Sequence, residues 1–237
     1  MSTWYEIWNK KGLNKISQTD QKKELVDLIA LDGFDTGHGS MDEQKWNMMI
    51  ELIKQKINFK NGDSVVDIGC GAGALLYPFY GLNNYKIIGI DYSTGLLEIA
   101  KKNMPKANFV CAQANKLPLE RESCNIVLCN SVFHYFLDLD YAKETLLEIL
   151  SVLKKGGECL ILDINDLSKK DYAEKKRREE LGNEEYERRY KDLSQIYYDK
   201  TWFENFAIEN NLEFEIFDQD IPGYVNAQWR FNFYFKK

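Results

Sequence analysis

An acid followed by alternating glycines is the first stretch of the sequence that could hold a ligand. Residues 65–75 read VVDIGCGAGAL, so a β-branched run reaches Asp67 and is followed by Gly69, Gly71 and Gly73. This order predicts a strand, a tight turn and the start of a helix. Glycines let a ligand approach the backbone closely, and the first turn of a helix offers unpaired N–H groups. The stretch is therefore a candidate binding site.

Two kinds of ligand fit a strand, a glycine turn, a helix and a later acid. A dinucleotide would place its pyrophosphate at the helix N-terminus and bond an acid roughly 20 residues further on. Asp91 stands 20 residues after Gly71, so the spacing alone leaves both kinds open. Asp67 favours the other kind. Its carboxylate would repel a pyrophosphate but would attract a ligand that carries an ammonium and a sulfonium.

Five stretches in order carry a family resemblance. Residues 65–76 (VVDIGCGAGALL) resemble the first motif of class I S-adenosylmethionine (SAM)-dependent methyltransferases of the small-molecule type. The other motifs of that family are resembled by 89–93 (GIDYS), 112–119 (AQANKLPL), 125–136 (NIVLCNSVFHYF) and 153–161 (LKKGGECLI). The resemblance covers about 62–165. It implies SAM as the cofactor, S-adenosylhomocysteine as its product, and methyl transfer as the activity.

The resemblance also implies residue roles on the methionine side of SAM. The backbone of Gly69, Cys70 and Gly71 would pass close to the methionine part. Asp67 would help to hold its amino group, and Asn130 would offer that group a backbone carbonyl. These residues come from the ends of two different expected strands. The resemblance therefore implies that the two strands lie side by side.

On the adenosine side, the resemblance implies that Asp91 accepts both ribose hydroxyls and that Tyr92 stacks on the adenine. The family often has an aspartate where this chain has Gln113, whose amide oxygen can accept the same bond from the adenine amine. Ala114 would be the neighbouring adenine contact. The alternatives are a helix cap for Asp91 and a packed surface aromatic for Tyr92.

His134 is the candidate catalytic residue. Methyl transfer from a sulfonium is an in-line displacement with a neutral leaving group, so the protein mainly positions reactants and excludes water. A hydroxyl acceptor also needs a base, and a neutral imidazole is suitable near pH 7. Of the two histidines, His134 follows the fourth expected strand and His38 lies in a glycine-rich loop. The alternative is a structural or substrate-shaping His134, with Tyr135 beside it as a candidate substrate contact.

Residues 168–198 are expected to form a helical lid insertion over the acceptor, as the corresponding segment of the family commonly does. Tyr197 and Tyr198 could line a small pocket, and Arg188 and Arg189 could clamp a phosphate or carboxylate. The alternative is a solvated helix with paired arginines and glutamates. We expect a small, polar, anionic acceptor, such as a phosphorylated or nucleotide-linked metabolite, with O-methylation favoured. Surface-polysaccharide or natural-product biosynthesis enters by family analogy alone.

Other acceptor classes fit the sequence less well. No Asn-Pro-Pro-Tyr follows the fourth expected strand, which argues against exocyclic DNA amines, and no basic RNA-binding extension is present. Asp163, Asn165 and Asp166 form one acidic cluster, so no metal is expected. The alternatives left open are a protein or RNA methyltransferase and a non-catalytic SAM-binding partner subunit. The expected partner is a small-molecule acceptor, with no nucleic acid and no membrane, for a monomer or homodimer.

The elements that would position these residues alternate between strands and helices. Such alternation predicts a doubly wound, mostly parallel sheet with helices on both faces. With the resemblance it implies seven strands and an antiparallel C-terminal edge strand, joined by a hairpin at the sheet's edge. The expected strands are 65–68, 86–90, 107–111, 126–129, 159–162, 213–217 and 229–235. The expected helices are about 41–57, 73–80, 94–103, 140–153 (capped by Gly156 and Gly157), 168–193 (a helix or helix pair over the sheet edge) and 201–210.

Composition sets the broad class. The 237 residues are 44% hydrophobic and 14% aromatic, with a net charge of −6. These values predict one globular domain over 1–237 and argue against nucleic acid as the main substrate. Residues 1–40, with three early aromatics, would form an N-terminal lid or cap segment. The absence of an apolar run near 18 residues, of a secretory signal and of paired cysteines predicts a cytoplasmic protein with reduced thiols.

Overall fold

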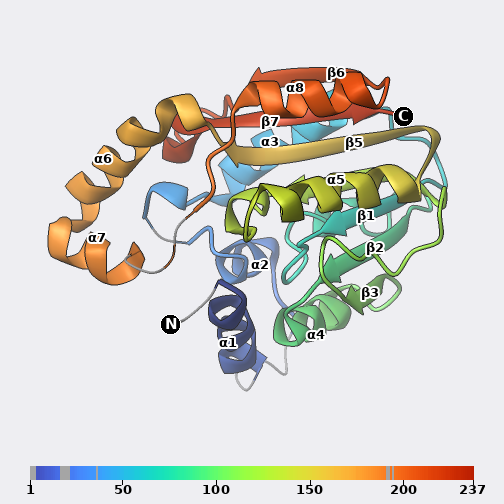
Figure 1. The fold of residues 1–237 in the computed structure, drawn as a ribbon. Coiled ribbons are helices and arrows are strands. Elements are labelled where there is room, and N and C mark those ends of the chain that lie inside the picture. Colours follow the sequence, from blue (N-terminus) through green and yellow to red (C-terminus); the bar gives the residue numbers. More distant parts are fainter. Residues whose placement is uncertain (1–3, 17–21, 36, 191–192, 194) are drawn as a thin grey trace.

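A seven-stranded mixed sheet forms the centre of the fold (Figure 1). The structure is a computed structural model, and it describes residues 4–16, 22–35, 37–190, 193 and 195–237. The strand order is β3-β2-β1-β4-β5-β7-β6. The strands are β1 (Ser64–Ile68), β2 (Lys86–Asp91), β3 (Asn108–Cys111), β4 (Cys124–Asn130), β5 (Leu153–Asn165), β6 (Glu213–Asp218) and β7 (Arg230–Lys236).

The predicted parallel core and antiparallel C-terminal hairpin are confirmed. The strands from β3 to β5 pair in parallel, and β7 pairs antiparallel with both β5 and β6. One detail of the prediction is corrected. β7, the last strand, lies one place in from the edge, and β6 is the edge strand. The three phenylalanines of β7, Phe231, Phe233 and Phe235, are fully buried. Their burial explains why β7 is covered by neighbours and the more polar β6 is outermost.

Helices cover both faces of the sheet, as predicted. α2 (Leu25–Leu31), α3 (Glu43–Lys56) and α4 (Thr94–Asn103) share one apolar cluster with residues of β1, β2, β4 and β5. α5 (Leu139–Val152) and α8 (Lys200–Glu209) pack on the other face with the phenylalanines of β7. The N-terminal helix α1 (Trp4–Ile16) packs against α4.

Two local predictions are wrong. The expected helix over 73–80 is a series of turns ending in a short 3-10 helix, η2 (Tyr77–Phe79), and Gly73 at its start takes a positive φ that an α-helix does not allow. The expected cap at Gly156 and Gly157 is not at a helix end. α5 ends at Val152, and both glycines lie within β5, where the pairing with β4 shifts register.

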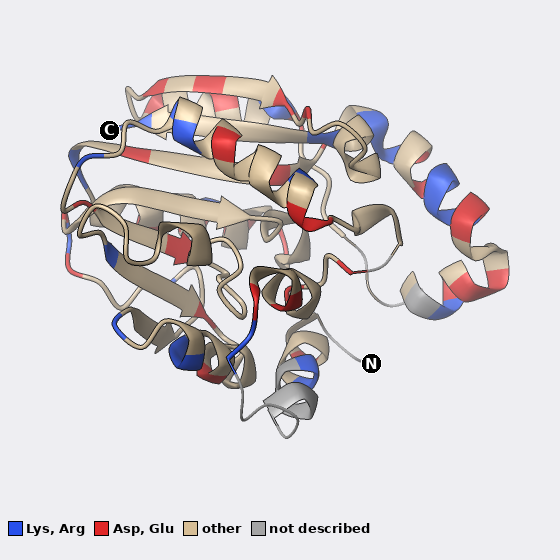
Figure 2. Ribbon diagram, turned by 180° about the vertical axis from the view of Figure 1, so that it is seen from behind, with Lys and Arg blue, Asp and Glu red and all other residues tan. Residues whose placement is uncertain are grey.

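The carboxyl ends of the parallel strands meet at one edge of the sheet, where open α/β folds bind ligands. η3 (Phe133–Tyr135) follows β4 there, and η4 (Leu167–Lys169), α6 (Lys170–Leu181) and α7 (Asn183–Tyr190) follow β5. The predicted helix pair is present, but Figure 1 shows it projecting beyond the strand ends rather than lying along the sheet edge. Figure 2 shows both signs of charge mixed along α6 and α7.

Candidate functional site

A cavity of about 910 Å³ lies at the carboxyl ends of the strands. This volume is near the upper end of the roughly 300–1,000 Å³ typical of ligand pockets. The cavity is lined by all nine predicted cofactor residues, the predicted base and one predicted substrate contact. They are Asp67, Gly69, Cys70, Gly71, Asp91, Tyr92, Gln113, Ala114, Asn130, His134 and Tyr135.

An aspartate from the N-terminal segment holds the glycine turn. The carboxylate of Asp32 accepts hydrogen bonds from the backbone N–H groups of Ala72, at 2.6 Å, and Ala74, at 3.0 Å. Gly71 makes this approach possible, because a Cβ at its position would lie 2.2 Å from Asp32 Oδ1. Its φ of +53° also lies in the left-handed region that favours glycine. The turn is therefore closed by a side chain 40 residues away in the sequence.

Three carboxylates crowd around this turn. Burial raises the pKa of Asp32 to about 7, against the opposing effect of its two backbone hydrogen bonds. Burial, followed by the charges of Asp32 and Asp91, raises the pKa of Asp67 well above its usual value. Asp67 is 2% exposed, and its Oδ1 has no hydrogen-bond partner among the described residues. A buried, unpartnered acceptor among acids is an environment that a cationic group would stabilise.

Asp91 links the second strand to the same turn. Its Oδ2 accepts from the N–H of Gly71 at 2.9 Å, and its Oδ1 accepts from the N–H of Ser93 at 2.7 Å. Burial raises its pKa despite these bonds. Each carboxylate oxygen has a second lone pair for a further donor, such as a hydroxyl. The carboxylate can therefore brace the turn and accept from a ligand at the same time.

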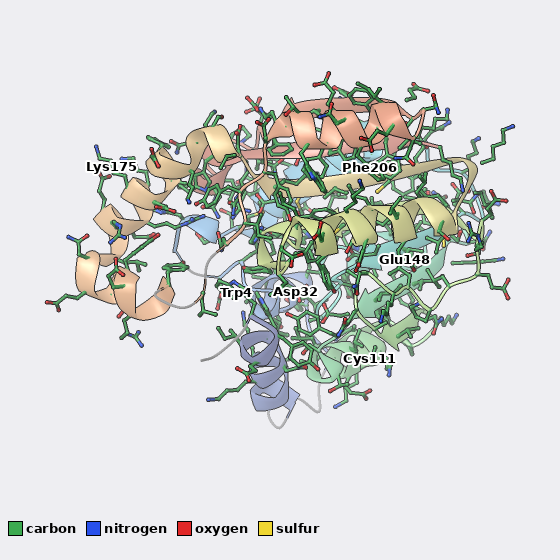
Figure 3. All side chains as sticks on the ribbon, in the orientation of Figure 1. Trp4, Asp32, Cys111, Glu148, Lys175 and Phe206 are labelled. Atoms are coloured by element: carbon green, nitrogen blue, oxygen red, sulfur yellow. The ribbon has the colours of Figure 1, made fainter. Side chains whose placement is uncertain are left out.

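Aromatic side chains of α1 close the cavity from the N-terminal side. The ring of Tyr5 lies 4.9 Å from that of Tyr92, and the ring of Trp4 lies 4.7 Å from that of Tyr135. The ring of Trp8 also lies 5.7 Å from Tyr135. Trp4 and Asp32 both line the cavity, and Figure 3 shows the labelled Lys175 on α6, away from both. The lid or cap role expected for 1–40 stays a prediction, and parts of 1–40 lie outside the described residues.

At the other end of the cavity, an arginine fixes the predicted base. Arg230 Nη1 lies 2.8 Å from His134 Nδ1 and donates to the backbone carbonyl of Asp163 at 2.8 Å. A guanidinium has donors only, so Nδ1 of His134 must be the acceptor. Burial, followed by the charges of Arg230 and Arg177, holds the pKa of His134 well below its usual value. Burial and the two arginines therefore favour the neutral form of the ring.

A second arginine reaches the cavity from α6. Arg177 of α6 is 8% exposed and donates to the hydroxyl of Tyr197 at 2.6 Å. Its guanidinium lies 5.9 Å from the ring centre of Trp229, a cation–π contact. Both Arg177 and Arg230 line the cavity. Buried arginines are uncommon unless they are paired, so this end of the cavity suits an anion.

Four substrate predictions in the lid need correction or stay open. Arg188 points to solvent, with 72% of its side chain exposed, and pairs with Glu185. Tyr198 is 1% exposed and uses its hydroxyl to bond the Phe133 carbonyl at 2.8 Å, so it is part of the core. Tyr197 does not line the cavity and reaches it only through Arg177. The side chain of Arg189 lies outside the described residues, so its predicted role stays a prediction.

The sequence reasoning missed Asp32, Arg177 and Arg230. The sequence around Asp32 indicates a loop and gives no partner for the carboxylate. Arg177 lies in a run of charged residues, a pattern typical of a solvent-exposed helix. A signal was present for Arg230, because it lies between Trp229 and Phe231 in an aromatic strand. A charge in an apolar strand is rarely fully buried without a partner. That position alone could have marked Arg230 as a site residue.

Within the described ranges, no group of three or more His, Cys, Asp and Glu side chains is placed to hold a metal ion. No helix in the described part of the chain is long and apolar enough to cross a membrane.

Comparison with known proteins gives a consistent family. Residues 66–161 match the family described as Methyltransferase domain. The chain is 30% identical over 119 residues to an uncharacterized methyltransferase of Schizosaccharomyces pombe, covering 50% of this chain and 46% of that protein. It is 31% identical over 117 residues to the tRNA (carboxymethyluridine(34)-5-O)-methyltransferase of Saccharomyces cerevisiae, covering 49% and 39%.

A third relative has a different named activity. The chain is 32% identical over 111 residues to the ubiquinone/menaquinone biosynthesis C-methyltransferase UbiE of Campylobacter jejuni, covering 44% of this chain and 46% of that protein. The matches therefore span less than half the length of these curated relatives. Among solved structures, a Haloferax volcanii methyltransferase in complex with the Trm112 activator has a TM-score of 0.66 at 16% identity, covering 100% of this chain and 98% of that chain. That likeness shows the fold.

Proposed function

The chain belongs to the class I SAM-dependent methyltransferases by its domain at 66–161, and we propose that it transfers the methyl group of SAM to an oxygen of a small anionic acceptor. One observation carries the proposal. A single cavity joins the acid-ringed glycine turn at one end to two buried arginines at the other. The first end fits a cationic methyl donor, and the second fits an anionic acceptor.

The cofactor end fits SAM in three respects. The unpartnered Oδ1 of Asp67 offers a buried acceptor to an ammonium group. The carboxylate of Asp91, already braced by Gly71 and Ser93, offers acceptor capacity to paired hydroxyls. Gln113 and Ala114 line the same cavity beyond β3. When bound, SAM supplies a methyl carbon on a positively charged sulfur, and the crowded carboxylates favour that charge.

The acceptor end supports an oxygen anion. Arg177 and Arg230 can each offer a planar set of donors that matches a carboxylate or phosphate. The yeast relative's name gives an O-methylation of a carboxymethyluridine, which is consistent with an anionic acceptor. The alternative acceptors are proteins, RNA and carbon atoms of small molecules. Two relatives are named for methylation of tRNA and of carbon, but the two buried arginines of this chain favour a small anion.

The residues of this chain position the two reactants and exclude water from them, and this reaction needs little else from the protein. The aromatic side chains of α1 cover the cofactor end, where Tyr5 contacts Tyr92 and Trp4 contacts Tyr135. We propose that residues 1–40 act as a lid and that 168–198 carry Arg177 to the acceptor. The cap and the lid would then enclose the reacting atoms between them.

A transfer assay with methyl-labelled SAM tests this function. The purified chain is incubated with separate pools of small carboxylates, phosphate monoesters, neutral alcohols, quinols and bulk tRNA. We expect labelled product from an anionic small-molecule pool. Transfer confined to tRNA would favour the RNA alternative, transfer to carbon of quinols would favour a C-methyltransferase, and binding of SAM without transfer to any pool would favour a non-catalytic partner subunit.

A further inference from the structure

We propose that His134 is a fixed hydrogen-bond donor, not a base, and that the acceptor it serves is a carboxylate that becomes a methyl ester. The inference rests on the proposed function and names its substrate class. It begins from the contact between Arg230 and His134, which determines where the imidazole proton must be.

The hydrogen-bond partner of Nδ1 determines which ring nitrogen of His134 carries the proton. Arg230 Nη1 lies 2.8 Å from Nδ1 of His134, and an arginine can only donate. Nδ1 must therefore present its lone pair to Arg230. A neutral imidazole has one proton, so that proton is on Nε2. An Nε2–H group can donate a hydrogen bond, but it cannot take a proton from an acceptor hydroxyl while Nδ1 stays bonded to Arg230.

Two positively charged side chains face His134. Arg230 comes from β7, Arg177 comes from α6, and the backbone carbonyl of Asp163 comes from β5. The two guanidinium groups oppose a positive charge on the ring, and burial opposes it further. The ring is 1% exposed. The backbone carbonyl of Asp163 acts in the opposite direction and raises the pKa of His134, but burial and the two guanidinium groups outweigh it and favour the neutral imidazole.

The nearest carboxylate to His134, that of Asp163, is not placed to act as a base. Both oxygens of Asp163 accept from the hydroxyl of Tyr224, at 3.0 and 3.1 Å, and Oδ2 also accepts from Ser131 Oγ. Asp163 does not line the cavity. Its carboxylate is therefore occupied behind the cavity wall. His38 and Glu180 also line the cavity, but they pair with each other, with His38 Nδ1 2.9 Å from Glu180 Oε2.

The buried positive and negative charges around His134 do not balance. Arg177 and Arg230 face one buried carboxylate, Asp163, whose Oδ2 lies 3.7 Å from Arg230 Nη1. Glu180 is partly exposed and pairs with His38. Among the described buried side chains at this end, one positive charge has no counter-charge, and Arg230 Nε is a buried donor without a partner. A singly charged carboxylate balances that charge better than a phosphate dianion.

The chemistry needs no base. A carboxylate oxygen can form the bond to the methyl carbon with its own lone pair, while the carbon–sulfur bond breaks and its electron pair stays on sulfur. The products are a methyl ester and a neutral thioether, and no proton leaves the acceptor. The Nε2–H of His134 and the two arginines would hold the second carboxylate oxygen and orient the first.

The test reads the tautomer directly. The experiment is two-bond ¹H–¹⁵N NMR of protein labelled with ¹⁵N-histidine. The chain contains two histidines, so the signals that remain in the His38→Asn variant belong to His134. We expect His134 to be the Nε2–H tautomer and not to titrate from about pH 5 to pH 8. An Nδ1–H tautomer, or a titration midpoint near the usual histidine pKa of about 6.5, would overturn the proposal whatever the activity.

A binding arm tests the acceptor class without turnover. S-adenosylhomocysteine-loaded protein is titrated with a panel of small carboxylic acids, their primary amides and phosphate monoesters. We expect at least one acid, but not its amide, to shift the Nε2 resonance of His134. A response to phosphate monoesters alone, or equal responses to acid and amide, would overturn the carboxylate assignment.

An activity arm separates a donor from a base. His134→Gln keeps an amide donor and should retain transfer within about tenfold, whereas His134→Phe should raise the acceptor KM more than it lowers kcat. Loss of kcat by about 10²-fold or more in both variants, the usual contribution of a base, would overturn the donor role. The labelled product should release methanol in alkali as an ester does, and an alkali-stable product would contradict the ester.

Discussion

The carboxylate of Asp32 accepts a 2.6 Å hydrogen bond from the backbone N–H of Ala72, across 40 residues of sequence. This contact joins the N-terminal segment to the glycine turn that would hold the cofactor. It also packs a side chain into the space that Gly71 leaves open. Cofactor binding and the position of the N-terminal segment should therefore be coupled.

Gly71→Ala tests that packing. The new Cβ would lie 2.2 Å from Asp32 Oδ1 at a φ of +53°. Gly81→Ala is the matched control, because Gly81 also has positive φ (+81°) but has nothing within 4 Å of the added Cβ. Both variants should lose roughly 1–2 kcal/mol to the left-handed backbone, and Gly71→Ala should lose at least about 1 kcal/mol more from the clash.

Denaturant unfolding of both variants measures the difference. The double variant Gly71→Ala, Asp32→Ala should cost less than the sum of the two single changes, because Asp32 is the group that the new Cβ meets. Equal stability of the Gly71 and Gly81 variants would show that Asp32 does not occupy this space.

Asp32→Asn tests the buried charge. Burial raises the pKa of Asp32 to about 7 from an ordinary 3.8. The folded state therefore binds this proton more tightly than the unfolded state, so the group's contribution to stability falls as pH rises from about 4 to about 7. The variant lacks this titration. Its melting temperature should therefore rise relative to that of the wild type as the pH increases across this range.

The control is Asp35→Asn, because Asp35 is exposed in the same loop. Its melting temperature should follow that of the wild type at each pH. A melting-temperature difference between Asp32→Asn and wild type that stays constant over the range would mean that Asp32 titrates at its ordinary value.

Arg177→Gln tests the acceptor clamp. Loss of a charge-assisted contact, worth about 1.5–3 kcal/mol, should raise the acceptor KM by roughly 10- to 100-fold and leave SAM affinity unchanged. Arg188→Gln is the control from the same lid, because Arg188 is exposed and pairs with Glu185. Steady-state kinetics with varied acceptor gives both values. An equal effect of the two substitutions would remove Arg177 from the site.

The cofactor half of the site could be predicted from the sequence because its residues lie in short motifs at strand ends. Asp67, Asp91 and Asn130 end β1, β2 and β4, and parallel strands bring such ends to one edge. The fold followed from the same alternation of strands and helices. Errors arose where glycine conformation overrode an apolar pattern, as in the turns over 73–80.

The acceptor half was harder to predict because its residues come together only through tertiary packing. Arg177 lies among Lys175, Lys176 and Arg178, and only its position on α6 turns it toward Trp229. Asp32 gains a role only when its loop packs on the glycine turn. Arg188, which was predicted from the sequence as an anion clamp, has a suitable guanidinium group but points to solvent instead of the cavity.

Isothermal titration calorimetry with SAM tests the central claim most directly. Wild type and Asp35→Ala should bind SAM with the same affinity. Asp91→Ala, confirmed as folded by its melting curve, should bind roughly 30- to 700-fold more weakly, the equivalent of about 2–4 kcal/mol for the loss of paired charge-assisted bonds. No binding of SAM or S-adenosylhomocysteine to the folded wild type, or unchanged affinity in Asp91→Ala, would contradict the account.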